Sequence, residues 1–340
     1  MLAGHDEPVD RWKGPFGSSG GGHDSDHRRR APTVRRPGWT VAAAALLVAG
    51  AALWSYRQRD YRPVFSRAAG ELITVRDSTG IGRAKDGKTL TEVTLVSDTG
   101  LEVRVRVRAP GGRTGERHPA ALLIGGLDTG RKAVDVPPES ENLVLAGIDY
   151  PYEGPEDPTT WEWVRYFPHM RRAILTTPPA LLLAAQYLYT RDDVDAERVS
   201  IIGVSLGVPF AAAAAATDRR LAGAALLHGG ADIRRMIAYA YADVGAPWLV
   251  DLMAIGLAWV LAPLEPARYA GEIAPRPLLM VNATSDEMIS LDSVRALYGA
   301  ARRPKRMVWL ETRHVALSNP EVVANLMRLT LEWMEDQGLR

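Results

Sequence analysis

The spacing of apolar residues in the first part of the body is that of β-strands. Glu71–Arg76, Thr89–Ser97 and Leu101–Arg108 are rich in alternating or β-branched residues, and Asp98-Thr99-Gly100 predicts a hairpin turn between the last two. Leu101–Arg108 alternates strictly, so its valines share one face and its arginines share the other. We therefore expect an outer antiparallel strand whose arginines face solvent.

Beyond these strands, apolar runs alternate with helical stretches. The predicted strands are Ala120–Ile124, Asn142–Ile148, Val199–Ile202, Ala222–Leu227, Pro277–Val281 and Met307–Leu310. The predicted helices are Met170–Tyr189, Leu206–Thr217 and Pro320–Asp336. This alternation predicts an α/β fold with a doubly wound, mostly parallel sheet and N-terminal antiparallel strands. In such sheets ligands bind at the carboxyl ends of the strands.

One apolar segment is too long to be a simple connection between two of these strands. Met236–Ala262 is helix-like, and its aromatic and large apolar residues include Tyr239, Tyr241, Trp248, Met253 and Trp259. Its last part, Pro247–Ala262, has 16 residues with Asp251 among them, which is short of a membrane span. We predict a helical cap insertion at about residues 231–272 that covers the site. The alternative is an ordinary core helix.

Three segments are predicted ahead of the body. Residues 1–36 are rich in Gly, Ser, Asp, His and Arg, which predicts a disordered basic tail. Pro37–Tyr56 has no charged residue, and its 20 residues at about 1.5 Å each would span the hydrocarbon layer of a membrane. It is therefore predicted to be a transmembrane anchor or a cleaved signal, with Ala49-Gly50-Ala51 as the cleavage pattern. Residues 57–70 are predicted to be a linker, and residues 71–340 the catalytic domain.

Charges on either side of the apolar segment predict its orientation. The arginines that precede it are Arg28, Arg29, Arg30, Arg35 and Arg36, and those that follow it are Arg57, Arg59 and Arg62. By the positive-inside rule, we expect a single-pass protein of the cell membrane with its catalytic domain outside the cytoplasm. The alternative is secretion after cleavage of the signal.

Composition excludes several classes of function. The 340 residues are 46% apolar and 24% charged, which is enough for a well-buried core. A net charge of +1 and the lack of a basic, aromatic face outside the tail argue against a nucleic-acid partner. Without cysteine there is no disulfide, no thiolate nucleophile and no thiolate zinc site. No metal-ligand or phosphate-loop spacing occurs near the strand ends, so we expect neither a metal nor a cofactor.

The motif Gly203-Val204-Ser205-Leu206-Gly207 lies between the predicted strand Val199–Ile202 and a helix of small residues. This order of strand, tight turn and helix is typical of a nucleophile elbow, which exposes the serine hydroxyl on a strained bend. The glycines let the helix pass close to the strand. Ser205 is therefore the candidate nucleophile.

A serine nucleophile needs a base and an acid that orients the base. His314 follows the last predicted strand and is the candidate base, with His228, at the end of an earlier strand, as the alternative. Asp286 lies in the loop after Pro277–Val281 and is the candidate acid, with Glu287 and Asp232 as substitutes. The chain order of nucleophile, acid and base is that of a known hydrolase arrangement.

Two backbone amides are candidates for binding an oxyanion. Leu206 follows the serine at the start of a helix, where amides point outward. Leu127 lies in the loop that follows Ala120–Ile124 and would supply the second donor. The second assignment depends on position alone.

Three stretches together resemble the α/β-hydrolase superfamily, in particular its dienelactone-hydrolase and prolyl-oligopeptidase-like esterase branches. They are Asp193–Gly207, which ends in the elbow, Ile273–Leu279, which leads to the acid loop, and Arg313-His314. The resemblance extends over about residues 71–338 and implies acyl-enzyme chemistry at a triad of Ser205, Asp286 and His314. The chain departs from the family at Gly125, where many members carry the histidine of a His-Gly oxyanion motif.

The sequence thus predicts a serine hydrolase that cleaves carboxylic esters and needs no cofactor. The apolar, aromatic cap favours a small-molecule ester with an apolar acyl or aryl group. The same triad would serve an amidase, a peptidase or an acyltransferase. A non-catalytic, membrane-tethered binding protein on a hydrolase fold is the alternative of another class.

Overall fold

The computed structural model describes residues 37–84, 86–111, 115–126, 128–137, 142–152, 154–155 and 160–340. Leu53–Arg340 is one compact unit, and the chain before it belongs to a second unit. The tail predicted at residues 1–36 lies outside the described residues.

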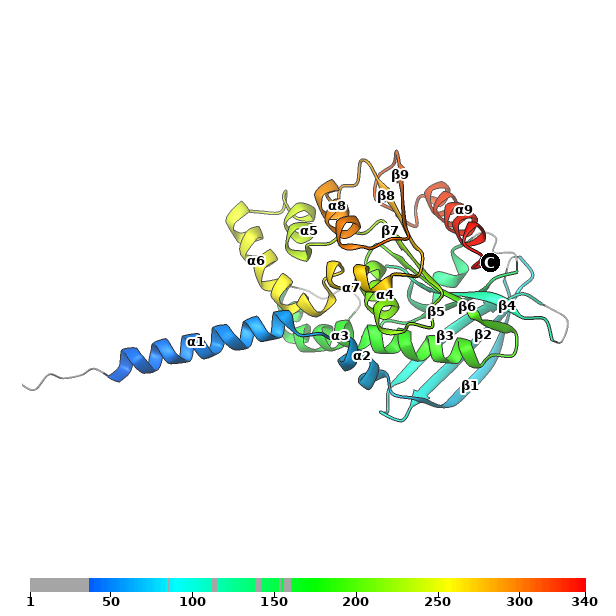
Figure 1. Ribbon diagram of the computed structural model, residues 1–340, viewed down its shortest axis with the longest axis horizontal. Coiled ribbons are helices and arrows are strands. Elements are labelled where there is room, and N and C mark those ends of the chain that lie inside the picture. The colour runs from blue at the N-terminus through cyan, green and yellow to red at the C-terminus, as the bar shows by residue number, and fades with distance from the viewer. Residues whose placement is uncertain are drawn as a thin grey trace, which may run out of the picture. The chain divides into compact units, whose positions relative to one another are not determined.

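The strands of the described chain form one nine-stranded sheet in the order β1-β2-β3-β5-β4-β6-β7-β8-β9 (Figure 1). They are β1 (Leu72–Arg83), β2 (Thr89–Ser97), β3 (Glu102–Ala109), β4 (His118–Ile124), β5 (Val144–Ile148), β6 (Val194–Val204), β7 (Gly223–Leu227), β8 (Leu278–Ala283) and β9 (Lys305–Leu310). The pairs β1–β2, β2–β3 and β3–β5 are antiparallel. The pairs β5–β4, β4–β6, β6–β7, β7–β8 and β8–β9 are parallel. The predicted mostly parallel sheet with N-terminal antiparallel strands is confirmed.

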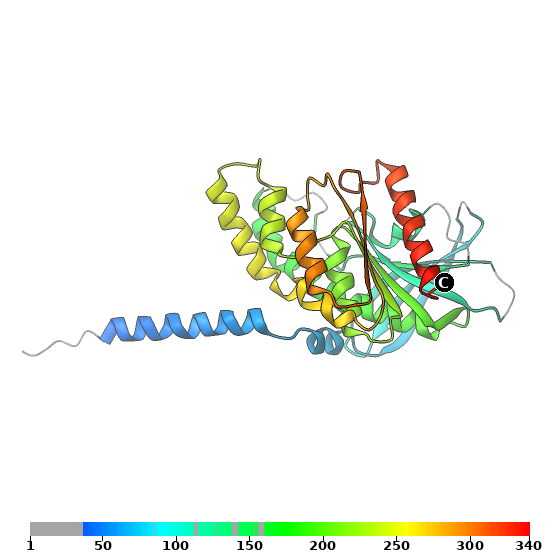
Figure 2. The same ribbon diagram turned by 45° about the horizontal axis from the view of Figure 1, so that its top comes forward.

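Helices cover both faces of the sheet, and each face has its own core (Figures 1 and 2). On one face lie α2 (Arg62–Ala69), α3 (Thr160–Thr190), α4 (Gly207–Thr217), α7 (Ala267–Ile273) and α8 (Leu291–Ala300). On the other face lie α9 (Pro320–Asp336) and the short 3₁₀ helix η1 (Gly130–Asp135). This arrangement leaves the carboxyl ends of the parallel strands free to carry a site.

The arginine row of β3 differs from the sequence-based expectation. β3 lies between β2 and β5 and is not an outer strand. The Arg104 side chain is 69% exposed, but Arg108 is buried. The Arg108 guanidinium donates to the carbonyls of Val134 at 3.0 Å and Pro137 at 2.7 Å, and it pairs with Asp86. The predicted solvent exposure is wrong at this end of the row, because η1 and the residues after it cover that face.

The segment predicted as a linker, residues 57–70, contains a packed helix. Tyr61, Phe65 and Ala69 follow each other at helical spacing, and their exposed fractions are 6%, 1% and 1%. The Phe65 ring lies 6.4 Å from that of Tyr269 on α7. The compact unit therefore begins before residue 71, because α2 contributes its apolar face to the core.

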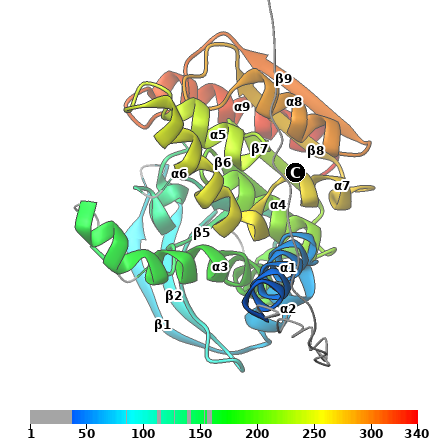
Figure 3. The same ribbon diagram turned by 90° about the vertical axis from the view of Figure 1, so that its left-hand side faces the viewer.

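The segment predicted as a cap folds into α5 (Ile233–Ala240) and α6 (Pro247–Val260), followed by the short 3₁₀ helix η2 (Ala262–Leu264) and α7. Figure 3 shows α5 and α6 side by side at the rim of the body. Whether they cover the site stays a prediction.

A helix, α1 (Pro37–Gln58), forms over the segment for which a membrane anchor or signal is predicted. Within the described ranges, no single helix is both long and apolar enough to cross a membrane. By length and composition alone, α6 together with Ala262–Ile273 would suffice, but the two parts are bent by 69°.

Candidate active site

Ser205 occupies a strained turn between β6 and α4. Its φ is 53°, in the left-handed region that residues with a Cβ rarely adopt. A Cβ on Gly207 would lie 2.1 Å from the carbonyl oxygen of Ile124, and one on Gly203 would lie 2.6 Å from the Cβ of Ala211. The motif therefore needs both glycines, because α4 crosses close to β4 and β6.

The three candidate residues for nucleophile, base and acid form a continuous hydrogen-bonded chain. Ser205 Oγ lies 2.7 Å from His314 Nε2, and His314 Nδ1 lies 2.8 Å from Asp286 Oδ2. Ser205 follows β6, Asp286 follows β8 and His314 follows β9, so all three side chains come from carboxyl ends of parallel strands. An Nδ1–H tautomer of His314 would donate to Asp286 and leave Nε2 free to accept the serine proton.

Asp286 is held in its ionised form by its surroundings. The residue is 6% exposed, and its Oδ1 accepts the backbone amides of Met288 at 2.9 Å and Ile289 at 2.8 Å. Burial would raise the pKa of Asp286, but its interactions with His228, His314 and the Ile289 amide outweigh burial and hold that pKa well below its usual range. A carboxylate in this state can stabilise a protonated His314.

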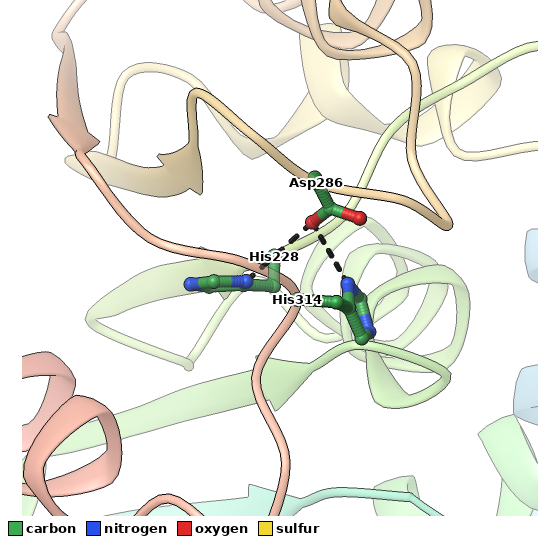
Figure 4. A group of neighbouring side chains, drawn as sticks. All are labelled: His228, Asp286 and His314. Atoms are coloured by element: carbon green, nitrogen blue, oxygen red, sulfur yellow. Dashed lines mark hydrogen bonds and ion pairs between the residues drawn. The ribbon is translucent and has the colours of Figure 1, made fainter.

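His228 contacts Asp286 and His314, while the hydrogen-bond partner of Ser205 Oγ is His314. It is fully buried, its Nδ1 accepts the Val315 amide at 3.1 Å, and the same atom lies 3.6 Å from Asp286 Oδ2 (Figure 4). Its ring is 5.5 Å from the His314 ring, edge to face. His314, and not the alternative His228, is therefore the histidine in hydrogen-bond reach of Ser205.

By distance alone, His228, Asp286 and His314 also form a group that could hold a metal ion. Two nitrogens and a carboxylate suit several divalent metals. However, Nδ1 of His314 is hydrogen-bonded to Asp286, and Nδ1 of His228 accepts an amide proton. A metal would have to displace both hydrogen bonds, so this donor set fits a proton-transfer chain better than a metal site.

A pocket of about 510 Å³ opens beside Ser205 and His314. Its wall is mostly apolar and includes Leu123, Ile202, Leu227, Val323, Leu326 and Met327. Within the described ranges, none of its lining residues belongs to α5 or α6. The pocket therefore extends from the serine toward η1 and α9, on the side of the sheet away from α4.

Several solved structures share this architecture. An acetyl xylan esterase from Paenibacillus sp. R4 is 17% identical with a TM-score of 0.60, and the match covers 80% of this chain and 94% of that one. Acetyl xylan esterase 1 from Thermoanaerobacterium sp. JW/SL YS485 is 14% identical with a TM-score of 0.57, covering 82% and 94%. The chain has an α/β-hydrolase fold. A hypothetical protein from Pseudomonas aeruginosa with 16% identity and a TM-score of 0.55 also matches, over 78% of this chain and 99% of that one.

No family model and no curated protein sequence matches the chain. The α/β-hydrolase fold is therefore recognised from the arrangement of the backbone, at sequence identities that carry no information on substrate.

The substitute acids have other contacts in this α/β-hydrolase fold. Glu287 accepts the backbone amide of His314 at 3.1 Å and pairs with Arg313. Asp232 caps α5 by accepting the amide of Arg235. Neither is hydrogen-bonded to the His314 ring, so Asp286 is the acid that the structure brings to it.

The two candidate oxyanion donors differ in what the structure says of them. The Leu206 amide lies at the N-cap of α4, next to the serine, while the turn's own hydrogen bonds join Ser205 N to Leu227 O and Val208 N to Ser205 O. Leu127 lies outside the described residues. The Leu206 amide, beside Ser205 at the start of α4, stays the candidate donor to an oxyanion.

Sequence reasoning missed the wall of the pocket. Val323, Leu326 and Met327 recur at helical spacing on α9, which marks an apolar face. Spacing does not separate residues that line a cavity from residues that fill a core. These three residues could be assigned to the pocket only from the structure, which places α9 near Ser205.

Proposed function

We propose that this protein is a serine hydrolase that cleaves carboxylic esters through an acyl-enzyme intermediate. The observation that carries the proposal is the hydrogen-bonded chain from Ser205 Oγ through His314 to Asp286 at the mouth of an apolar pocket. The structural similarity to two acetyl xylan esterases is consistent with it.

In the acylation half-reaction, Ser205 Oγ attacks the carbonyl carbon of the ester while its proton passes to His314 Nε2. Asp286 stabilises the imidazolium that results. The amide of Leu206, with that of Leu127 as the proposed second donor, binds the oxyanion. The tetrahedral intermediate collapses when the C–O bond to the alcohol breaks and His314 returns the proton to the leaving oxygen.

In the deacylation half-reaction, His314 Nε2 takes a proton from water as the water oxygen attacks the acyl carbon. The bond to Ser205 Oγ then breaks, and His314 protonates that oxygen. The products are a carboxylic acid and free enzyme, so no oxidant, reductant or cofactor is needed.

We propose that the acyl group enters the apolar pocket and is larger than acetyl. The pocket has a volume of about 510 Å³, within the usual range for ligand sites, and its wall offers aliphatic side chains. An aryl ester would place its ring there in the same way. The relatives named above act on acetyl groups according to their names, so chain length is the property to measure.

A fluorophosphonate probe tests the catalytic role of Ser205. The wild-type protein is expected to react with the probe and to hydrolyse p-nitrophenyl butyrate, and Ser205→Ala is expected to do neither. Ser66→Ala, which changes an exposed serine on α2, is the matched control and should behave as the wild type. Equal hydrolysis by wild type and Ser205→Ala would overturn the proposal, and transfer of the acyl group to an added alcohol in excess of hydrolysis would indicate an acyltransferase.

We also propose that residues 37–56 tether the body to a cell membrane, with the catalytic domain outside the cytoplasm. Support comes from the lack of charge in this stretch, its helical form and its exposed apolar side chains, which include Leu46 and Leu47 at 74% each. The many alanines make it only moderately apolar. An intact N-terminus on protein from the membrane fraction is the expected result. A mature N-terminus near residue 51 would instead show a cleaved signal.

A further inference from the structure

The outer face of α6 exposes a group of large apolar side chains. It consists of Trp248, Leu249, Leu252, Met253 and Ile255, whose exposed fractions are 70%, 51%, 59%, 38% and 38%. Val250 and Ala254, on the inner face of the same helix, are buried. A helix that is apolar on both faces, with one face uncovered, marks an interaction surface.

This outer face is not a wall of the substrate pocket. None of its five residues lines the pocket beside Ser205, which extends toward η1 and α9. The contact between this region and the triad runs through α5, where Tyr239 Oη donates to the carbonyl of Asp286 at 3.1 Å. The outer face of α6 therefore has a binding partner other than the acyl group of the substrate.

Insertion of this region across a membrane does not fit its packing. The α-helix that follows along the chain, α7, places Tyr269, Ala270 and Ile273 in the core on one face of the sheet. Because these residues are held inside the body, α6 and α7 cannot form a span without unfolding the core. Only the outer face of α6 is free, so contact with a lipid layer would be shallow and parallel to the helix.

The C-terminal end of α6 is joined to the end of the uncharged segment 37–56. Tyr56 Oη donates to the carbonyl of Val260 at 3.1 Å, and the Arg57 guanidinium lies 5.5 Å from the centre of the Trp259 ring. Arg268, at the start of α7, donates to the carbonyls of Arg57 and, at 2.5 Å, Arg59. If residues 37–56 lie in a membrane, these contacts bring α6 to the membrane surface.

The exposed basic side chains at this junction complement anionic headgroups, and the Asp60 carboxylate beside them is paired with Arg62. Arg57, Arg59 and Arg172 are exposed, and Arg171, next to Arg172, donates to Tyr56 Oη at 3.4 Å. Asp251 is the only ionisable residue of α6. Exposed apolar side chains that include a tryptophan, with basic side chains close by, favour contact with the interfacial layer of a bilayer.

We propose that the outer face of α6 docks into the interfacial layer of the membrane to which residues 37–56 tether the body. The proposal rests on that tether. Docking would fix the orientation of the body, with the α5–α6 side against the lipid.

A fluorescent label on a single cysteine tests the docking, because the chain has no cysteine of its own. The full chain carrying Leu252→Cys is labelled with an environment-sensitive nitrobenzoxadiazole dye and reconstituted into phosphatidylcholine–phosphatidylglycerol vesicles. The matched control is Ile73→Cys, an apolar residue on β1 that is 63% exposed. Both labelled proteins should hydrolyse p-nitrophenyl butyrate as the wild type does, which shows that they are folded.

The expected result is a blue shift of the Leu252→Cys label and its quenching by spin-labelled lipids, with neither effect for Ile73→Cys. An unchanged Leu252→Cys label on protein that floats with the vesicles would overturn the docking proposal and leave the tether intact. Failure of the protein to float would overturn the tether and the docking together. A shift that disappears on dilution to less than one protein per vesicle would show that a second copy, not lipid, covers the face.

Discussion

The pocket beside Ser205 and the outer face of α6 are both built from apolar side chains, yet only one of them is enclosed. In the pocket, Leu326 is 3% exposed and Met327 is 6% exposed, whereas Trp248 on α6 is 70% exposed. The pocket ends at the hydrogen-bonded Ser205 and His314. On the outer face of α6, by contrast, all five apolar side chains are exposed.

This difference shows that apolar composition alone does not locate a substrate site. The segment that forms α5 and α6 is apolar and contains several aromatic residues, and the sequence therefore predicts that it caps the acyl group. The structure offers the enclosed space on the other side, against α9. Substitutions at the pocket should therefore alter ester hydrolysis, whereas substitutions on the outer face of α6 should not. Four predictions test this contrast.

The largest effect is expected at the polar end of the pocket. Asp286→Asn should lower kcat for p-nitrophenyl butyrate by about 10⁴-fold, because an amide can no longer hold His314 in the Nδ1–H tautomer or stabilise its cation. Steady-state kinetics measure the change, and circular dichroism checks that the fold is retained. Asp251→Asn, on α6, is the control and should leave kcat unaltered. If Asp286→Asn lowers kcat by less than tenfold, Asp286 is not the acid of the proposed triad.

The next effect concerns the apolar wall. Val323→Trp, at a half-buried pocket position on α9, should fill part of the cavity and lower kcat/KM for butyrate or hexanoate esters relative to acetate by about 10-fold to 100-fold. Ala324→Trp introduces the same ring one residue along the helix, where it does not line the pocket. If both variants keep the wild-type ratio of long to short esters, the acyl group binds elsewhere.

Much of this arrangement could be predicted from the sequence, because periodicity reports which residues are buried. β2 and α9 have the predicted bounds, and the three candidate side chains Ser205, Asp286 and His314 lie together because strand ends meet at one edge of a parallel sheet. The spacing of residues along one strand also predicted correctly which face of β3 is buried.

The failures share a physical cause. Alternation assigned the arginines of β3 to one face but could not show that η1 covers Arg108, since that contact joins residues far apart in the chain. For the same reason the core role of Phe65 was missed, as its partner is Tyr269. The direction of the pocket likewise depends on how α9 crosses the sheet. The sequence pattern predicts which face of a helix or strand is buried. Which other element covers that face depends on tertiary contacts.

A third prediction uses the ionisation of Asp286. Because its pKa is lower in the folded than in the unfolded chain, the carboxylate stabilises the fold above about pH 4, and this contribution is lost as the pH falls through the folded pKa. The free energy of unfolding of wild type should exceed that of Asp286→Asn by about 2 kcal/mol near neutral pH, and the gap should narrow in acid. Urea titrations at several pH values measure it. A gap that stays constant with pH would contradict the assigned ionisation of Asp286.

The smallest effect is expected on the outer face of α6. Trp248→Ala should change the free energy of unfolding by no more than about 0.5 kcal/mol in lipid-free solution, because a side chain that is 70% exposed loses little packing when it is shortened. Trp333→Ala on α9 makes the same chemical change at a position that is 3% exposed, and it should cost about 3–5 kcal/mol. Thermal unfolding of the two variants beside the wild type measures the contrast. A large loss in Trp248→Ala would mean that the outer face of α6 is packed against the protein itself, and the surface would then no longer be free for a membrane.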